Sequence, residues 1–572
     1  MHVNTLVKGY PLLRSTHEAA YQTLEDILQE FDVSKQEGAA SSNVRFEGDI
    51  PHPNTTHSQN LNLTLVGCIP ALANAVAAAE ILEARGGPRQ TITADLRRGH
   101  NYIDPGIGMT PTINGQEITM DVVAGNPFIN NIFETRDGKY AVLSAVYVDL
   151  AYKWTALLGC SMAEHDVREK VKQWFSTDLE DLALSAGMPM AICQTESSWT
   201  AHPQGQVLSK LPWVPSRRLP TGGNAPFSPW SALPTEPRRP LSGIKVLCLT
   251  HAIAGPSAGR TLAEHGASVL QIMFTHGFEH QFVYTYANLG TASTRLNLNN
   301  NSDRARLRTL VQEAHVWIDS FRPGAIAKFG FDDVDIFALN PAMIVSHIRV
   351  YGTTGPWAHT PGFDMQGSAS SGMMALCGEG VGDGRPQWPP GMVINDYTTG
   401  YSTALAIQSM LLKRFRGEVS VEDGWLLSPS LCGTAMGILK YFKTSRFATA
   451  HDACDETSAP LPPLTIEEQT GLGYLRTLAP LPQMGVTPIC YENGLLVPMG
   501  SSSPVFPGFD QEYSFDTAGP DDHTGLHAVL VSANDKIERL RVMGEERRAS
   551  RDKAERSTGT ARHWDAYAGM DS

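Results

Sequence analysis

From residue 244 onward, short apolar segments alternate with segments that favour helices. The predicted strands cover residues 244–250, 268–272, 315–319 and 343–350. A turn at 254–259 is expected to lead into a helix at 260–265, and a second helix is expected at 303–313. Such alternation is typical of a parallel sheet covered by helices, so we expect an α/β fold with a Rossmann-like sheet. The predicted turn, Ala-Gly-Pro-Ser-Ala-Gly, lacks the G-x-G-x-x-G pattern of dinucleotide-binding proteins.

A proline-rich segment precedes this alternation. Eight prolines lie between Pro212 and Pro240, and so many prolines cannot sustain a helix or an inner strand. We therefore place a domain boundary there. A weaker break is predicted at 451–463, and from about residue 545 the chain is charged and poor in apolar residues.

Two distant segments share the same local order of helix, glycine stop, strand and acidic residue. Residues 71–96 run from an Ala/Leu-rich helix through Arg-Gly-Gly to Asp-Leu, and residues 404–426 repeat that order with Arg-Gly and an acidic pair. We interpret this as a partial internal duplication. The alternative is that helix–glycine–strand connections are simply common.

Charge and cysteine content exclude several classes of function. The chain has a net charge of −14, from 45 Lys and Arg against 59 Asp and Glu, so nucleic acid and anionic membranes are unfavourable partners. Its eight cysteines lie far apart without a C-x-x-C pair, which favours reduced thiols over a zinc site or disulfides. No fully apolar stretch of 18 residues and no secretory signal is evident. We expect a soluble, cytoplasmic enzyme.

Three ordered segments resemble the family III CoA-transferases of the CaiB/BaiF type. Residues 243–272 resemble the opening strand–helix–strand of that family. Residues 319–331, with Ser-Phe-Arg-Pro-Gly, resemble its N-F-R-P-G stretch, and residues 361–372 and 393–400 resemble its later motifs. The resemblance implies a Rossmann-like CoA-binding large domain and a smaller α/β domain, with CoA as a substrate and no permanently bound cofactor or metal.

The resemblance also implies how the chain is divided. Residues from about 60 to 215 resemble the back half of a family member, whereas residues 241–430 resemble the front half. We therefore expect five parts: a remnant of a large domain at 1–59, a half copy resembling the small domain at 60–215, a linker at 216–240, the large domain at 241–450, and a C-terminal region with a polar tail at 451–572. Family members form interlocked dimers, so the resemblance allows either a homodimer or a site built within one chain.

Asp396 is the candidate catalytic residue. It matches the nucleophilic aspartate of the family's G-D-x-x-x-G motif, and it stands in Asn-Asp-Tyr-Thr-Thr-Gly. A carboxylate can attack an acyl-CoA thioester and form an activated anhydride, and CoA can then re-attack to form an aspartyl-CoA thioester. The alternative is that Asp396 only caps a helix at 401–412.

The resemblance assigns six further residues to CoA binding. They are Ser320, Phe321, Arg322, Lys328, Phe363 and Asp364. Lys328 occupies the basic position near the CoA phosphates, and Ser320 and Phe321 match the segment that lines the nucleotide. The alternative for Arg322 and Lys328 is an ordinary solvated cation.

Two departures from the family leave the substrate open. Acyl-CoA racemases on this fold have a histidine where this chain has Phe363, and the formyl and oxalate transferases have a glutamine where it has Ile253. We expect transfer of CoA between an acyl-CoA and a free carboxylic acid. The alternatives are an acyl-CoA racemase or isomerase, with His251 or His359 replacing the missing histidine, and a non-catalytic partner protein on the CoA-transferase fold.

Overall fold

The computed structural model describes residues 16–34, 41–51, 60–103, 108–119, 125–129, 131–219, 229–274, 277–391, 393–446 and 459–508. All of them belong to the first of two compact units, which ends at Phe509. The charged tail expected from residue 545 lies outside the described residues.

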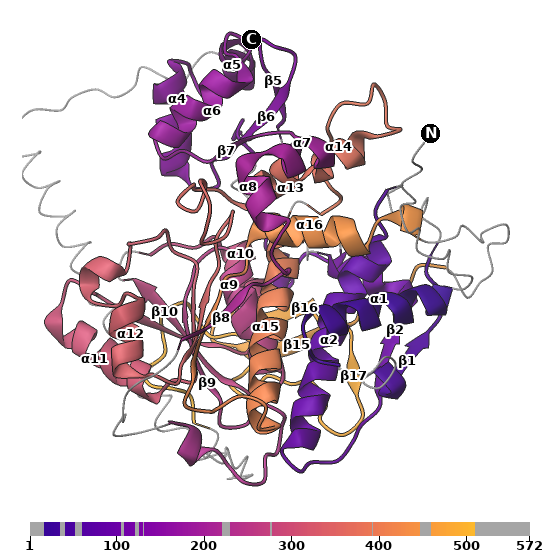
Figure 1. Ribbon diagram of the computed structural model, residues 1–572, viewed down its shortest axis with the longest axis vertical. Coiled ribbons are helices and arrows are strands. Elements are labelled where there is room, and N and C mark those ends of the chain that lie inside the picture. Colours follow the sequence, from indigo (N-terminus) through magenta and orange to yellow (C-terminus); the bar gives the residue numbers. More distant parts are fainter. Residues whose placement is uncertain are drawn as a thin grey trace, which may run out of the picture. The chain divides into compact units, whose positions relative to one another are not determined.

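A seven-stranded sheet forms the centre of this unit (Figure 1). Its strands, in spatial order, are β11 (Ala292–Leu296), β10 (Ser268–Phe274), β9 (Lys245–Leu249), β12 (Val316–Asp319), β13 (Ile344–His347), β14 (Gly424–Leu427) and β8 (Ser216–Leu219). All neighbouring strands are parallel except the antiparallel pair of β14 and β8. The expected parallel α/β sheet is therefore confirmed. Strand β8 lies inside the proline-rich segment, and it is an edge strand, which is the position in a sheet where nearby prolines are tolerated.

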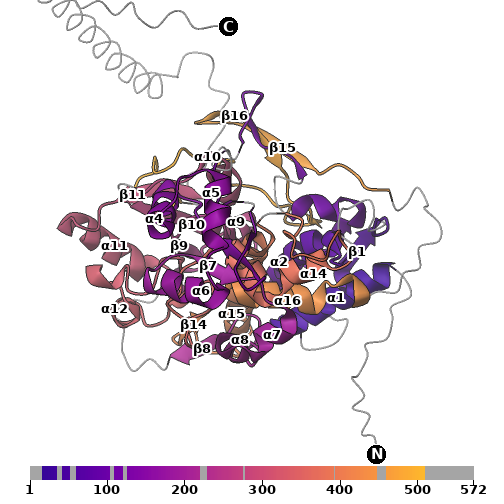
Figure 2. The ribbon, with the colours of Figure 1, turned by 90° about the horizontal axis from the view of Figure 1, so that it is seen from above.

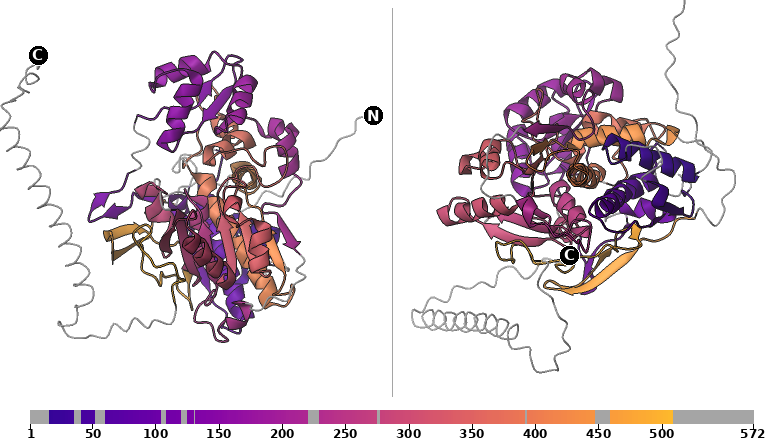
Figure 3. Two further views of the ribbon diagram at one scale, coloured as in Figure 1. Left: turned by 90° about the vertical axis from the view of Figure 1, so that its left-hand side faces the viewer. Right: turned by 60° about the horizontal axis from the view of Figure 1, so that its bottom comes forward.

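Helices cover both faces of the sheet (Figure 3). The helices on one face are α2 (Leu63–Ala84), α9 (Ala254–Glu264), α10 (Gln281–Ala287) and α15 (Ile394–Phe415), and those on the other face are α11 (Asn301–Glu313) and α12 (Asp333–Leu339). On the first face, α15 packs against both α9 and α2. The inner strands β9, β10, β12 and β13 are therefore buried on both faces, which explains why they are mostly apolar.

One local prediction is wrong. The segment 254–259 was expected to be a turn, but α9 already begins at Ala254. Pro256 lies in the first turn of that helix, where its missing N–H group costs no intrahelical hydrogen bond. Gly255 permits the close approach, because a Cβ there would lie 2.5 Å from the Thr250 side chain.

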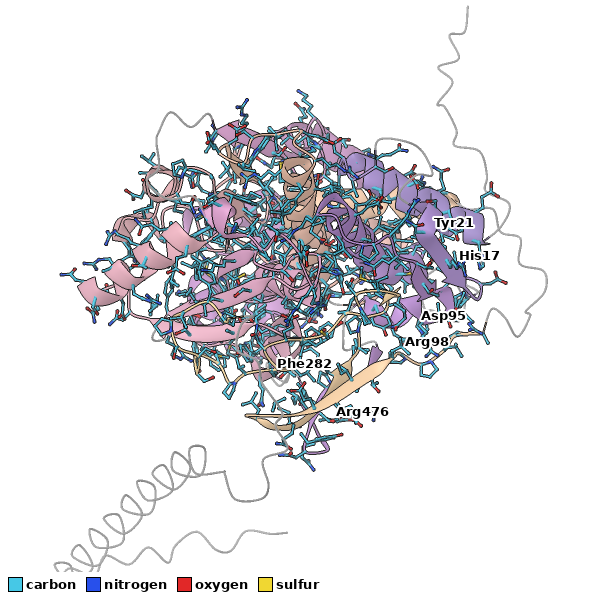
Figure 4. The ribbon with its side chains drawn as sticks, turned by 90° about the horizontal axis from the view of Figure 1, so that it is seen from below. His17, Tyr21, Asp95, Arg98, Phe282 and Arg476 are labelled. Carbon is cyan, nitrogen blue, oxygen red and sulfur yellow. The ribbon has the colours of Figure 1, made fainter. Side chains whose placement is uncertain are left out.

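The N-terminal residues form a layer with part of the C-terminal segment. Helix α1 (Thr16–Glu30) packs on α2, and strand β2 (Ile92–Asp95) lies between β1 (Val44–Glu47) and β17 (Gln483–Met484). His17 and Tyr21 lie on α1, and the Tyr21 hydroxyl donates a hydrogen bond to the Val44 carbonyl at 3.0 Å (Figure 4). At the end of β2, Asp95 pairs with Arg98 at 3.8 Å.

Helix α2 is more apolar than α15, the other 22-residue helix among the described residues. It has the length and composition of a membrane span, and 89% of its most apolar 18-residue stretch is buried inside the protein. It is therefore a core helix of this unit. Both α2–β2 and α15–β14 show the helix–glycine–strand order, but β2 and β14 lie in different sheets. The internal duplication stays a prediction.

A smaller α/β domain, residues 131–192, confirms the second part of the predicted fold. Its antiparallel sheet contains β5 (Phe133–Glu134), β6 (Tyr140–Leu143) and β7 (Met190–Ile192). Its helices are α4 (Val148–Leu158), α5 (Glu164–Val171) and α6 (Ser176–Ser185), which pack around Trp154 in a core of their own. Helix α13 (Asp364–Ser371) contacts β6 and β7, and therefore joins this domain to the large sheet.

The remaining elements connect these layers. They are helices α7 (Glu196–Ala201), α8 (Pro203–Leu208), α14 (Met373–Gly378) and α16 (Leu431–Tyr441), and strands β3 (Thr112–Ile113), β4 (Gln116–Glu117), β15 (Thr465–Thr470) and β16 (Gly473–Leu478). Strands β15 and β16 lie side by side in Figure 2 and continue into β3 and β4 as a four-stranded sheet.

Candidate active site

The loops after three neighbouring strands meet at one edge of the large sheet. They follow β9, β12 and β13, and ligands of open α/β sheets bind at this carboxyl edge. Together with residues around the start of α4, these loops enclose a cavity of about 370 Å³. The lining residues that matter below are Tyr147, Asp149, His251, Ala252, Ser320, Phe321, Arg322, Arg349, His359, Phe363 and Asp396.

Asp396 lies in the first turn of α15. Val393 is the N-cap of that helix and makes no side-chain capping bond, so the interpretation of Asp396 as a helix cap is wrong. The Asp396 backbone N–H donates to Oδ2 of Asp364 at 2.8 Å. Asp364 therefore satisfies one of the free N–H groups at the start of α15 and fixes the position of Asp396.

Asp364 itself is held in place by polar neighbours. It is 1% exposed at the start of α13, and it accepts hydrogen bonds from Asn395 Nδ2 at 3.0 Å and Ser368 Oγ at 3.2 Å. The large cavity is not lined by Asp364. Its contacts place it behind Asp396, as a support for the first turn of α15.

Close packing of α15 on α9 determines where the Asp396 side chain lies relative to the cavity. A Cβ on Gly400, one turn after Asp396, would lie 2.7 Å from the Cβ of Ser257 in α9. Only glycine permits this approach. Gly400, the glycine of the family-like motif, therefore lets α15 pack closely on α9, and this packing places the Asp396 carboxyl in the wall of the cavity.

The electrostatics around Asp396 favour its neutral form. Burial raises the pKa of Asp396 well above its ordinary value, and the charges of Asp364 and Glu279 raise it further. Burial also raises the pKa of Asp364 to about 7, although its hydrogen bonds act in the opposite direction. The Asp396 carboxyl must therefore lose its proton before it can act as a nucleophile.

A second cluster lies where the loop after β9 meets the smaller domain. Ala252 has a φ of 58°, a left-handed conformation that is unusual for a residue other than glycine. Its N–H donates to Oε2 of Glu279 at 2.6 Å. The Tyr147 hydroxyl lies 3.4 Å from Oε2 of Glu279 and 3.3 Å from Nδ1 of His251. Glu279 therefore holds the strained loop and Tyr147 together.

Cationic groups also line the cavity. Arg322 is exposed, whereas Arg349 is mostly buried and pairs with Asp319 at 2.8 Å. His347 also pairs with Asp319, at 2.5 Å. Burial lowers the pKa of His347, but the Asp319 charge and hydrogen bonds to Asp319 and Asp333 outweigh it and raise that pKa to about 9. Arg322 and Arg349 also border a second cavity of about 350 Å³, so the two cavities adjoin.

The structure brings most of the predicted site residues together. Asp396, Ser320, Phe321, Arg322 and Phe363 line the large cavity. Asp364 lies behind Asp396, as described above. Lys328 is exposed, and its ammonium lies 4.9 Å from the centre of the Phe329 ring. It lines neither of the two cavities, although its neighbour Ala327 lines the second.

Sequence reasoning missed Tyr147, Glu279 and Arg349. Arg349 lies near the end of segment 343–350, which is predicted as a strand. Because ligands bind at the carboxyl ends of such strands, its position could have identified it as a site residue. Tyr147 and Glu279 come from other parts of the chain and carry no local signal. Among the described residues, no group of three or more His, Cys, Asp or Glu side chains is placed to hold a metal ion.

Comparison with known proteins locates the family resemblance in the same part of the chain. The model of CoA-transferase family III matches residues 241–460. An acetyl-coenzyme A transferase, nodX, from Hypoxylon pulicicidum is 28% identical over 325 residues, which cover 52% of this chain and 54% of that protein. The acetyl-CoA:oxalate CoA-transferase of Acetobacter aceti is 31% identical over 224 residues, which cover 36% of this chain and 57% of that protein.

Among solved structures, a CaiB/BaiF family protein from Brucella suis is 30% identical with a TM-score of 0.31, and the match covers 35% of this chain and 55% of that one. The chain spans about half the length of the curated relatives that it matches. The family match includes β9, β12, β13 and the start of α15, which are the elements that build the cavity. Residues 241–460 of this chain therefore form a domain of CoA-transferase family III.

Proposed function

We propose that this protein transfers CoA from an acyl-CoA thioester to a free carboxylic acid, with Asp396 as the nucleophile. The Asp396 carboxylate attacks the thioester carbonyl, the C–S bond breaks, and CoA leaves as a thiolate, which produces a mixed anhydride. The thiolate then attacks the aspartyl carbonyl, so the donor acid leaves as a carboxylate and an aspartyl-CoA thioester remains. The acceptor carboxylate then attacks the aspartyl-CoA thioester and releases the CoA thiolate, which produces a second mixed anhydride. The thiolate attacks the acceptor's acyl carbonyl, so the new acyl-CoA leaves and the Asp396 carboxylate is restored.

One observation carries the proposal. Asp396 is a buried carboxyl in the wall of a cavity that is also lined by exposed and half-buried cations. A thioester nucleophile needs protection from water, whereas the phosphates of CoA need cations near solvent. The cavity offers both, and Asp396, Arg322 and Arg349 all lie in the segment that matches the transferase family.

The CoA-binding residues are proposed on the same basis. The two adjoining cavities, of about 370 and 350 Å³, provide an elongated space for a ligand with a nucleotide end and a long arm. We assign the phosphates to Arg322, the nucleotide to Ser320 and Phe321, and the arm to Phe363. Lys328 lines neither cavity, and we assign it to the phosphates on the family resemblance alone. Asp364 does not contact CoA in this assignment. It affects the reaction by accepting the hydrogen bond from the Asp396 N–H, which fixes the position of Asp396.

A second candidate, an acyl-CoA isomerase or racemase, is favoured by one observation. His251 and His359 line the same cavity as Asp396, so a histidine is available although Phe363 occupies the family position. Burial and the charge of Arg322 lower the pKa of His251 to about 4. So weak a base is poorly suited to removing an α-proton near pH 7, which supports the transferase.

Two measurements on the intact chain test the proposal. A set of acyl-CoA donors is incubated with the protein without an acceptor, and the intact mass is recorded before and after hydroxylamine. The wild type should gain an acyl or CoA group that hydroxylamine removes or converts, and Asp396→Asn should not. Asp149→Asn is the matched control, because Asp149 lines the same cavity from α4 and pairs with Lys153.

The second measurement separates the two candidates. A 2-methylacyl-CoA is incubated in D₂O without an acceptor acid. A transferase leaves the α-proton in place, whereas a racemase exchanges it. Rapid incorporation of deuterium without an acceptor would reject the transferase in favour of the isomerase, and an Asp396→Asn protein that transfers CoA at the wild-type rate would reject Asp396 as nucleophile.

A further inference from the structure

A second, much smaller cavity lies against Asp396. It has a volume of about 40 Å³ and shares Tyr147, Ala252, Phe363 and Asp396 with the large cavity. The rest of its wall is mainly apolar, from Ile129, Val146, Ile253, Val283, Met365 and Val393. Asp396 is therefore placed at the junction of a large, open cavity and a small recess.

The recess has room for only a few atoms. Measured with a water-sized probe, a cavity needs about 10–15 Å³ to hold one water molecule, so about 40 Å³ holds about three groups of that size, which is the end of a chain of two or three carbons. Val283, which is 5% exposed, and Met365, which is 3% exposed, limit it with well-packed side chains. A longer chain would have to displace them, and interiors of this density resist such displacement.

The charges around the recess exclude a second carboxylate. Besides Asp396, its lining includes the carboxyl groups of Asp364 and Glu279, and among the described residues no Lys or Arg lines it. His280 also borders it, but Nε2 of His280 already contacts the Val146 carbonyl at 3.2 Å. A carboxylate at this position would be desolvated without a cationic partner, beside buried carboxyl groups that already disfavour one another's ionisation.

We propose that this recess is the acyl subsite and that it takes a short, uncharged acyl group such as acetyl or propionyl. The inference rests on the proposed function, because the acyl carbon must reach Asp396. The sulfur and the pantetheine arm of the donor then lie in the large cavity, and the acyl chain points away from them into the recess. Dicarboxylic acyl groups, such as succinyl, are rejected by charge, and chains of six carbons are rejected by size.

Val283 provides a pair of opposite tests. Val283→Ala enlarges the recess and should raise kcat/KM for butyryl-CoA relative to acetyl-CoA by about tenfold, the discrimination that one methylene commonly gives. Val283→Phe fills the recess and should reduce acetyl transfer by about a hundredfold or more, while the Kd for free CoA stays within twofold. Val148→Ala is the control, because Val148 is 58% exposed on α4 and lines neither cavity.

The donor series is measured by turnover and, separately, by calorimetric binding. We expect the wild type to bind acetyl-CoA at least fivefold more tightly than succinyl-CoA or hexanoyl-CoA, and to transfer it at least tenfold faster. If the binding preference holds but no donor is turned over, the proposed function fails and the acyl subsite stands. If succinyl-CoA or hexanoyl-CoA is transferred as fast as acetyl-CoA, or if the two Val283 variants leave the preference unchanged, the acyl subsite is wrong and the transferase stands.

Discussion

Asp364 holds Asp396 through its backbone: the Asp396 N–H donates to Oδ2 of Asp364 at 2.8 Å. The same contact brings two buried carboxyl groups together, so each disfavours the ionisation of the other. Position and reactivity are therefore linked. The residue that places the candidate nucleophile at the start of α15 also raises the pH at which it becomes nucleophilic.

This link predicts the effect of Asp364→Asn on the pH profile. An asparagine oxygen can still accept the hydrogen bond from the Asp396 N–H, but it adds no negative charge. Because the charge of Asp364 raises the pKa of Asp396, its removal lowers that pKa. The acidic limb of kcat/KM against pH should therefore move to lower pH. Asp149→Asn should leave the limb in place, and an unmoved or raised limb in Asp364→Asn would contradict the coupling.

Asp396→Asn should stabilise the fold at neutral pH. In the unfolded chain this carboxyl ionises above about pH 3.9, whereas in the folded chain burial and two carboxyl neighbours raise its pKa. Between those two pKa values the folded state binds more protons than the unfolded state, so wild-type stability falls as the pH rises.

The amide does not titrate, so the variant escapes this loss. Urea unfolding should therefore give Asp396→Asn a higher free energy of unfolding than wild type at pH 7.5, because the raised pKa of Asp396 no longer lowers the stability of the folded state. The gain should shrink toward zero near pH 4. An equal loss of stability at both pH values would instead mean that the side chain is structurally required.

Arg322→Ala and Lys328→Ala test the assignment of the phosphates. Arg322 borders both adjoining cavities, and we expect its loss to weaken CoA binding by about 1–2 kcal/mol, the value of a charge-assisted contact. Lys328→Ala should weaken binding by no more than that, because an exposed cation is screened by salt. Calorimetry at low and high salt measures both variants, with Lys210→Ala as the control. An unchanged Kd at low salt would make Lys328 an ordinary surface cation.

The sequence predicted the parts of this structure that depend on local pattern. Strands β9, β10, β12 and β13 are buried on both faces, so each is an apolar run that can be recognised without its neighbours. Asp396 was identified because its motif lies on one short segment. The cavity around it follows from strand order, since the loops after adjacent parallel strands must meet.

The rest depends on contacts between distant segments. Glu279 matters because it binds the N–H of Ala252, 27 residues earlier. Tyr147 belongs to the smaller domain and meets His251, 104 residues later in the chain. The start of α9 was misjudged for a related reason. Its glycines resemble turn residues, but Gly255 and Gly259 allow close packing on Thr250 and Cys248, which no local propensity encodes.

Gly400 and Ser257 provide the last prediction. Gly400→Ala would place a Cβ 2.7 Å from Ser257 Cβ and 3.1 Å from the Ala254 carbonyl oxygen, so α15 would have to move away from α9. We expect a loss of about 1–3 kcal/mol in the free energy of unfolding, as for other overpacked cores, together with a fall in kcat because Asp396 lies one turn earlier on α15.

The double variant Gly400→Ala with Ser257→Gly removes the nearer of these contacts. It should recover most of the lost stability and kcat, since neither side chain is proposed to touch substrate. Ser257→Gly alone is the matched control and should lose stability without a comparable fall in kcat. If the double variant regained stability but not kcat, the spacing of α15 and α9 would not be what positions Asp396.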